Sequence, residues 1–342
     1  MLEVFPLSLL IMTFLLGASA VWWAGTRLPR YVVSLSDKTG LGQGIAGMLV
    51  LGGITSLPEL ATATTAAAIG SPLIALNDVL GSAGFNILLL AAADMLLGPK
   101  PLTSVVAKPV TVIQGVLGMM LLALVIAAIT AGDQAVFGIA GVWSVLLAVG
   151  AFAAIRIADR SERRPMWLVI SQPDLPFAEE ENLAELDWRQ LLIGLTVLAA
   201  IILVGGATLA VSATLIAANT GIGGSLMGFL FVAAATSLPE LSAITGAIRH
   251  RRYELAVGEV FGSNLFNLAL IVVIDIVTSG PPILELAGPF EAMAALLALI
   301  LSGIFVLGLV ERRDRTIFRM GEDSIAVLII YAAGLSLLLT IK

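Results

Sequence analysis

The sequence has 342 residues, of which 59% are hydrophobic and only 12% are charged, and its mean hydropathy is +1.04. Because an ordinary soluble domain carries about 25% charged residues, this composition excludes a water-soluble enzyme. The chain has no cysteine and a single histidine, which excludes disulfides, thiolate chemistry and an imidazole cluster. The net charge of −6 does not predict the orientation in the membrane, because orientation depends on which loops carry Lys and Arg rather than on the sum of all charges.

Apolar windows of about twenty residues follow one another along the chain, as expected for helices that cross a hydrocarbon core of roughly 30 Å. We therefore predict an all-α polytopic membrane protein. The first window has no basic segment before it and is interpreted as a retained span rather than a signal peptide. The ten predicted spans cover residues 6–30, 44–69, 73–97, 109–131, 134–155, 190–217, 224–248, 254–278, 290–310 and 323–341.

Positive charge alternates from loop to loop. Seventeen of the 18 Lys and Arg residues lie in the odd-numbered loops, and only Lys342 lies at the other face. Cytoplasmic loops carry the excess of Lys and Arg, so the pattern predicts ten spans in the cytoplasmic membrane with both termini outside. His250 lies in the basic run 249–252 and is expected to belong to that cluster.

An internal repeat relates the two halves. A shift of 181 residues places residues 55–60 (TSLPEL) on 236–241 and residues 81–86 on 262–267, where Gly, Ser, Phe and Asn recur. Each half has five predicted spans, so the second half enters the membrane upside down, which is the plan of many secondary transporters. We expect one membrane domain made of repeats 1–155 and 190–342, joined by a solvated cytoplasmic linker, 156–189.

Polar side chains recur at matching depths in these spans. Glu59 and Glu240 lie mid-bilayer, where a carboxylate costs about 2.5 kcal/mol or more and needs a partner. Thr and Ser residues three and four positions earlier share the face of each glutamate. These side chains offer only oxygen, which suits hard cations such as Ca²⁺ or Na⁺. The predicted cation ligands are Thr55, Ser56, Glu59, Ser82, Asn86, Thr236, Ser237, Glu240, Ser263 and Asn267.

Prolines precede both glutamates. Pro58 and Pro239 each remove an intrahelical hydrogen bond and free carbonyl groups about a turn earlier. We expect carbonyls around Gly52 and Ala233 to be possible backbone ligands, as in the discontinuous helices of transporters.

TSLPEL followed by GSxxFN, present twice in inverted halves, resembles the alpha-repeats of the calcium/cation antiporter superfamily, on the sodium/calcium exchanger branch. The resemblance implies ten spans, alternating access, and exchange of Ca²⁺ for a monovalent cation. It also implies that the ten residues above are the ion ligands, that both glutamates are indispensable, and that spans 1 and 6 slide over a fixed core. Asn267 stands where some members carry Asp, so two core carboxylates remain and the number of coupling ions stays open.

Four further acidic residues lie nearer the span ends. Asp78 and Glu259 are equivalent under the repeat, four residues before Ser82 and Ser263 respectively. We consider them either vestibule carboxylates on the outer and inner access paths or partly solvated acids. Asp94 and Asp275 are expected to be interfacial.

The predicted function is exchange of Ca²⁺ for Na⁺ through one midplane site, with H⁺ coupling through the same glutamates as the alternative. A channel is disfavoured because no filter loop is evident, and an enzyme because a Cys or membrane His nucleophile system is missing. We expect no cofactor and no nucleic acid partner, only the transported ions and the lipid bilayer, and function as a monomer.

Overall fold

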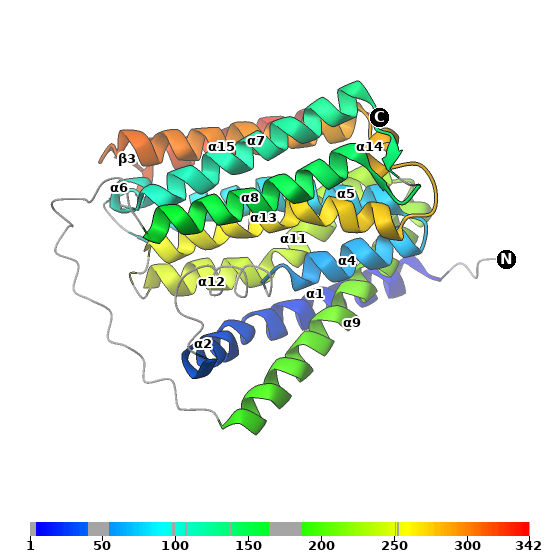
Figure 1. Ribbon diagram of the computed structural model, residues 1–342, viewed down its shortest axis with the longest axis horizontal. Helices are drawn as coiled ribbons and strands as arrows, with labels where there is room; N and C mark the ends of the chain where they lie inside the picture. Colours follow the sequence, from blue (N-terminus) through cyan, green and yellow to red (C-terminus); the bar gives the residue numbers. More distant parts are fainter. Residues whose placement is uncertain are drawn as a thin grey trace.

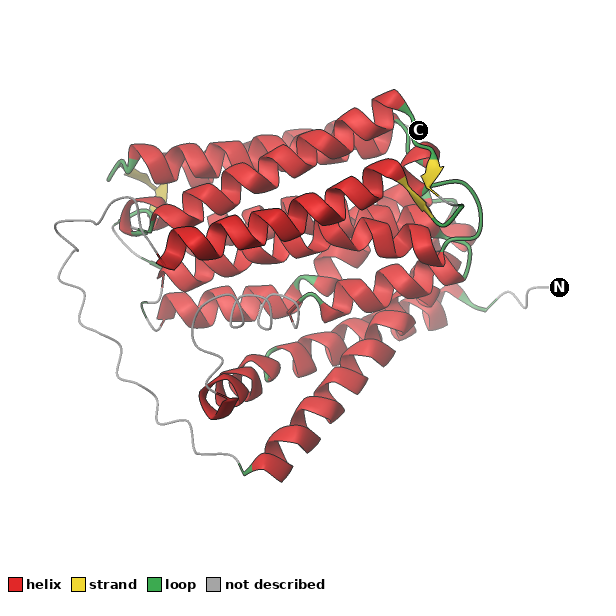
Figure 2. Cartoon of the chain, viewed as in Figure 1, coloured by secondary structure: helices red, strands yellow, loops and turns green. Residues whose placement is uncertain are grey.

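Long helices make up nearly all of the computed structural model, which describes residues 5–39, 55–97, 100–106, 108–136, 138–163, 187–249, 251 and 253–341. Two short hairpins interrupt them, β1–β2 and β3–β4, each antiparallel (Figure 2). The order is α1 (Leu7–Gly25), α2 (Leu28–Thr39), α4 (Leu57–Ala68), α5 (Pro72–Asp94), α6 (Leu102–Val105), α7 (Pro109–Ala131), β1 (Ala135–Val136), β2 (Ala140–Gly141), α8 (Val142–Arg163), α9 (Trp188–Thr220), α10 (Gly224–Leu226), the π-helix η1 (Met227–Val232), α11 (Ala233–Thr236), α12 (Leu238–Arg249), α13 (Tyr253–Val277), α14 (Ile283–Leu286), α15 (Pro289–Glu311), β3 (Thr316–Ile317), β4 (Met320–Gly321) and α16 (Glu322–Leu338).

The expected membrane architecture is confirmed. Seven described helices are long and apolar enough to cross a bilayer, and the bent pair formed by residues 224–236 and 238–249 makes eight. The two other predicted spans correspond to α16, with 17 residues, and to α4, with 12 described residues. The start of α1 and the end of α16 lie at the same end of the bundle, which an even number of spans requires (Figure 1).

Several predicted boundaries were wrong. The first span ends at Gly25, and the chain then forms α2. The fifth predicted span began at 134, but a hairpin occupies residues 135–141 and α8 continues to Arg163, into the predicted linker. Apolar composition alone does not separate a short apolar hairpin from the start of a helix, because both are hydrophobic. The rest of the linker up to residue 186, and His250, lie outside the described residues.

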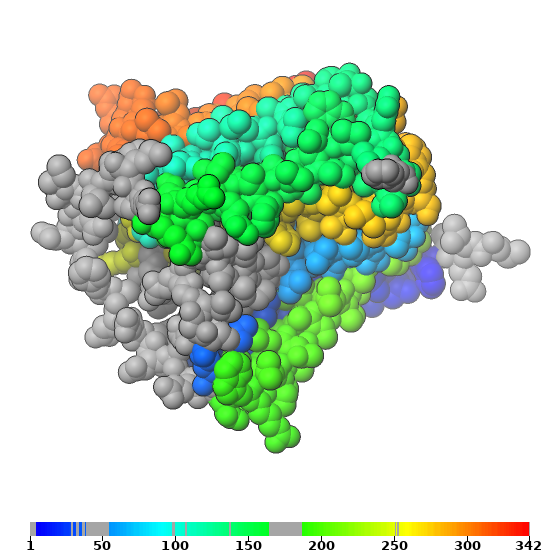
Figure 3. Space-filling view, viewed as in Figure 1, coloured from blue at the N-terminus to red at the C-terminus, as the bar shows by residue number. Residues whose placement is uncertain are grey.

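Two helices form the centre of the bundle. The apolar window of α5 is 83% buried and that of α13 is 61% buried, whereas those of α1 and α9 are each 28% buried. Helices α7, α8, α15 and α16 pack on one side of this central pair, and α4 and α12 lie on the other side, between the pair and α1 and α9 (Figure 1). On the surface, α9 projects from the body of the bundle (Figure 3). The two motif-bearing pairs therefore occupy the interior.

Helices α1 and α9 contact the motif helices of the opposite repeat through glycines. A Cβ at Gly25 of α1 would lie 2.4 Å from Cγ of Pro239, and a Cβ at Gly206 of α9 would lie 3.1 Å from the carbonyl oxygen of Pro58. Gly25 and Gly206 are related by the 181-residue shift. Each outer helix thus packs against the proline next to a predicted glutamate ligand at a glycine, where a side chain would be too close to that proline.

Asp94 and Asp275, which lie at or near the ends of α5 and α13, hold the two repeats together. Both are buried. Asp94 accepts hydrogen bonds from the N–H groups of Leu102 (2.5 Å) and Gly321 (2.7 Å). Asp275 accepts them from the N–H groups of Ile283 (2.5 Å) and Gly141 (2.8 Å) and from the hydroxyl of Ser144 (2.5 Å). Each carboxylate satisfies backbone donors at a short helix of its own repeat and at a hairpin of the other.

A candidate cation site at two broken helices

An equivalent non-helical serine, the second residue of each Thr-Ser pair, precedes α4 and α12. Ser56 precedes α4 with φ −86° and ψ 10°, and Ser237 ends α11 with φ −83° and ψ 5°. The two backbones therefore adopt the same non-helical conformation at equivalent positions. Pro58 and Pro239 follow at once in the first turns of α4 and α12, where a missing N–H costs nothing. In the second repeat the helix bends by 43° at this point.

The breaks place a helix N-terminus next to each glutamate. Glu59 lies in the first turn of α4, and Glu240 lies in the first turn of α12. The N-terminal end of a helix carries the equivalent of about half a positive charge, which stabilises a nearby carboxylate. None of the three ion pairs among the described residues involves either glutamate. The helix ends are therefore the local source of positive potential for these two buried acids.

The structure brings the predicted ligands together in the interior. Every one of them is at most 4% exposed, including both glutamates at 0%. Residues of α4 and α12 face residues of the central pair, α5 and α13, which those helices contact. Ser56 and Ser263, one from each repeat, are in contact within this interior. One buried cluster therefore combines oxygen-bearing side chains from both repeats.

Hydroxyl groups link the two repeats within this cluster. The hydroxyls of Ser56 and Ser263 are 3.0 Å apart, and Oγ of Ser82 lies 3.4 Å from Oγ1 of Thr236. Ser263 also donates to Oε1 of Glu240 at 3.4 Å. A ligand bound among these oxygens would contact α4, α5, α11 and α13 at once, so its binding would couple the two inverted halves.

Asp78 lies closer to the cluster than a vestibule carboxylate would. It is fully buried and accepts a hydrogen bond from Oγ1 of Thr236 at 3.0 Å, and a second from Thr62. Glu259 is 8% exposed, and its Oε1 makes no hydrogen bond. Neither acid lines an open vestibule in this conformation, because the surrounding helices close over both.

Two buried polar groups near the site were missed in the sequence. Asn264 accepts a hydrogen bond from the amide of Asn86 at 3.1 Å. Glu291 of α15 is 3% exposed and accepts from Asn77 of α5 (2.8 Å) and from Ser225 of α10 (2.5 Å). The residue equivalent to Asn264 in the first repeat is an alanine, so Asn264 is not among the polar residues that recur in both halves. Glu291 was read as part of an apolar window.

Several ligand atoms are buried without a hydrogen-bond partner. They are Oε1 and Oε2 of Glu59, Oδ1 of Asn86, Oγ of Ser237, Oε2 of Glu240, and both amide atoms of Asn267. A buried polar group without a partner costs about 1 to 3 kcal/mol, and more when charged, so native proteins retain such groups mainly where a ligand uses them. Five oxygens from four residues, two of them carboxylates, and one amide oxygen of Asn267 match what a Ca²⁺ or Na⁺ ion requires.

The cluster differs from a fixed metal centre. Among the described residues, no group of three or more His, Cys, Asp or Glu side chains lies close enough to hold a metal ion. Two glutamates with hydroxyl and amide oxygens make a weaker site, as a transporter needs in order to release its ion.

The expected backbone ligands need correction. The carbonyl of Ala233 already accepts the N–H of Ser237 at 3.0 Å. Pro239 instead removes the donor that a regular helix would direct at Ala235, four residues earlier, so the earlier prediction placed the freed carbonyl two residues too far back. Gly52 lies outside the described residues.

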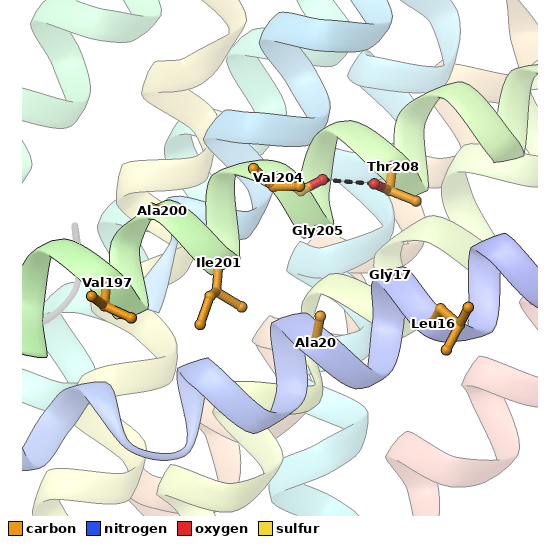
Figure 4. A pocket seen from close by; sticks show the side chains of 9 residues that line it. All are labelled: Leu16, Gly17, Ala20, Val197, Ala200, Ile201, Val204, Gly205 and Thr208. Carbon is orange, nitrogen blue, oxygen red and sulfur yellow. Dashed lines mark hydrogen bonds between the residues drawn. The ribbon is translucent and has the colours of Figure 1, made fainter.

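The groove between α1 and α9 is separate from the ion site. It has a volume of about 470 Å³ and is lined by α1 and α9 alone, at positions that include Leu16, Gly17, Ile201 and Val204 (Figure 4). Leu16 is 61% exposed and Val204 is 68% exposed. This apolar lining faces outward, where the bilayer would lie, and none of the predicted cation ligands borders it.

A sequence model of a known protein family matches both halves of the chain. The sequence model of the sodium/calcium exchanger protein family matches residues 9–158 and 187–340. CaxA of Alkalimonas amylolytica, which is named as an antiporter, is 28% identical over 316 residues, covering 88% of this chain and 91% of that protein. The inner membrane protein YrbG of Escherichia coli (strain K12) is 29% identical over 285 residues, covering 82% and 81% respectively.

Solved structures share the fold. The H⁺/Ca²⁺ exchanger CAX superposes with a TM-score of 0.67 at 15% identity, covering 96% of this chain and 86% of that one. The sodium-calcium exchanger NCX_Mj superposes with a TM-score of 0.58 at 22% identity, covering 97% and 99%. The arrangement of helices described above is therefore the fold that both of these structures have.

Proposed function

The chain belongs to the sodium/calcium exchanger family, and from this premise we propose that it exchanges Ca²⁺ for Na⁺ across the cytoplasmic membrane by alternating access. It is an integral membrane transporter of the cation/Ca²⁺ antiporter type. In the proposal, Ca²⁺ and Na⁺ occupy the buried cluster around Glu59 and Glu240 in turn, and the two termini lie outside the cytoplasm, as the placement of Lys and Arg favours.

The observation that carries the proposal is the set of unpartnered buried oxygens at two symmetric helix breaks. Glu59 and Glu240 together balance one divalent charge. Because Ca²⁺ and Na⁺ would use the same oxygens, the two ions compete, and competition at a single site enforces exchange rather than parallel leakage. Asp78, bonded to the ligand Thr236 at 3.0 Å, adds negative charge at the outer side of the same site.

Alternating access would use the packing of α1 and α9. These two helices contact each other and the broken helices, and they are the least buried of the seven long apolar helices that the structure describes. We propose that they slide as a pair over the fixed centre, α5 and α13, with the glycine contacts to Pro58 and Pro239 carrying the motion to the ligand-bearing turns. Small residues at such a contact allow backbones to approach and slip.

The coupling ion has two candidates. Na⁺ is favoured because most of the ligand set consists of hydroxyl and amide oxygens, which bind Na⁺ but neither take up nor release a proton near neutral pH. H⁺ is the alternative, because a buried carboxyl group can exchange its proton for a cation. The assay below separates them, since only one of the two gradients would drive Ca²⁺ movement.

The test is ⁴⁵Ca²⁺ flux in proteoliposomes that contain the purified protein, with either a Na⁺ gradient or a pH gradient imposed. Flux driven by Na⁺ supports the proposal. Flux driven only by the pH gradient assigns H⁺ as the coupling ion. Absence of Ca²⁺ flux with both gradients refutes Ca²⁺ exchange.

The ligand assignment has its own variants. Glu59→Gln and Glu240→Gln should each abolish flux, because the amide keeps the size of the side chain and removes the charge that balances Ca²⁺. Glu254→Gln is a matched control, because Glu254 also lies in the first turn of a helix but is partly exposed, away from the ligand cluster. Substantial exchange by either core variant would contradict the assignment.

A further inference from the structure

The two repeats differ at one position beside the ion site. Residue 83 of α5 and residue 264 of α13 are equivalent under the 181-residue shift, but the first is Ala and the second is Asn. Each directly follows a serine ligand and comes three residues before an amide ligand. Asn86 and Asn267, which are equivalent in the sequence, therefore have different neighbours.

Hydrogen bonds determine which way the Asn86 amide points. Nδ2 of Asn264 donates to the carbonyl oxygen of Ala83 at 3.1 Å. Because a backbone carbonyl can only accept, the NH₂ end of Asn264 must face it. Oδ1 of Asn264 is then left for Asn86, whose own NH₂ group donates to it at 3.1 Å. These two hydrogen bonds therefore fix the orientation of the Asn86 amide, with its oxygen on the side that does not face Asn264.

That oxygen is the atom a cation would use. Oδ1 of Asn86 is buried and makes no hydrogen bond with the protein. Since the NH₂ group of Asn86 is held by α13, the amide cannot turn over without losing a hydrogen bond in a buried environment, where unsatisfied donors are costly. The oxygen is thus presented as an acceptor before any ion binds.

Asn267 lacks such a partner. The residue at the position equivalent to Asn264 is Ala83, whose methyl group cannot hold an amide. Neither Oδ1 nor Nδ2 of Asn267 makes a hydrogen bond within 3.5 Å, although the side chain lies next to Glu59. No hydrogen bond within 3.5 Å fixes its direction, and the carboxylate of Glu59 beside it favours the NH₂ group on that side when no ion is bound.

We infer that Asn264 is a positioning residue of the transport site, which holds the amide of Asn86 with its oxygen toward the cation and thereby makes the two halves of the site unequal. The inference rests on the proposed function. Asn86 is then the preorganised amide ligand, and Asn267 is the adjustable one, able to accept a hydrogen bond, donate to Glu59 or coordinate an ion as occupancy changes.

The first test is Asn264→Ala, which copies the first repeat. The free amide of Asn86 would populate both orientations, and the apparent KM for Ca²⁺ should rise about 3- to 10-fold, while Vmax changes less than twofold. Asn264→Ser, whose side chain is too short to contact both partners, should give the same direction of change and replaces the alanine variant if that one does not fold. Thermal melting in detergent verifies folding.

A double-mutant cycle separates positioning from general packing. In an Asn86→Ala background, Asn264→Ala should leave the KM for Ca²⁺ unchanged, because the side chain through which Asn264 acts is already absent. An equal rise of KM in both backgrounds, or a fall in Vmax without a change of KM, would overturn the inference. Absence of Ca²⁺ flux with the unmodified protein would instead refute the proposed function. Failure of the inference and failure of the proposed function are therefore distinguishable.

Discussion

Gly81 tests whether the contact between α5 and the π-helix sets the geometry of the ion site. A Cβ at Gly81 would lie 2.3 Å from the carbonyl oxygen of Phe229 and 2.7 Å from Cβ of Ala233. Gly84, one turn further along α5 and also buried, would place a Cβ no closer than 3.7 Å to any neighbour. The pair allows the same substitution, Gly→Ala, to be compared at a tight and at an open position of one helix.

The size of the effect follows from these distances. Carbon and oxygen atoms in ordinary contact lie about 3.4 Å apart or more, so Gly81→Ala requires α5 and the π-helix to separate by roughly 1 Å, and the opposing atom belongs to the backbone. Overpacking of this kind costs about 1 to 3 kcal/mol, which exceeds the gain of about 1 kcal/mol in helix propensity. Gly84→Ala should keep that gain and match or exceed the stability of the unmodified protein.

The same separation should weaken ion binding. Ser82 follows Gly81 directly, and its hydroxyl lies 3.4 Å from that of Thr236, at the end of the segment that would be displaced. A shift of about 1 Å takes this pair beyond hydrogen-bond distance, so we expect the KM for Ca²⁺ to rise at least tenfold in Gly81→Ala and to stay unchanged in Gly84→Ala. Thermal melting and proteoliposome flux measure both effects. Equal melting temperatures and equal KM values for the two variants would refute this account of the site.

Three further substitutions test hydrogen bonds that buried acidic residues accept. Asp78→Asn keeps the size of a side chain that contacts Thr236, and we expect the KM for Ca²⁺ to rise about tenfold in flux assays; an unchanged KM would show that the charge plays no part. Ser225→Ala removes one donor to Glu291 and should lower stability by about 1 kcal/mol in thermal melts while the KM stays constant. Asp275→Ala leaves three buried donors without an acceptor and should cost several kcal/mol, whereas exposed Asp314→Ala should melt like the unmodified protein.

Much of the fold could be predicted because the bilayer imposes it. A segment in hydrocarbon must satisfy its own backbone hydrogen bonds, so twenty apolar residues predict a helix with little regard to neighbours. The predicted windows correspond to helices throughout the described residues. The errors fall at ends, where this constraint weakens: α1 ends at Gly25, and the chain before α8 forms a hairpin.

The candidate site could be located from sequence because charge is costly in the membrane. Glu59 and Glu240 were identified because they lie near the middle of predicted spans, and the shift of 181 residues showed that the same residues surround both. Their grouping into one buried cluster agrees with that analysis. Its assignment as the transport site is still a proposal, which the glutamine variants address.

The sequence by itself determined the membrane class, the inverted repeat and the oxygen-only character of the polar residues, because composition, periodicity and the positive charges of loops are local properties. Only the tertiary structure decided how the two halves contact each other. Asp94 and Asp275 became links between repeats, and Asn264 came to hold Asn86 while Asn267 was left without such a partner. These roles depend on which donor meets which acceptor between the repeats, and hydrogen bonds between residues 134 to 227 positions apart are set by packing rather than by any local pattern.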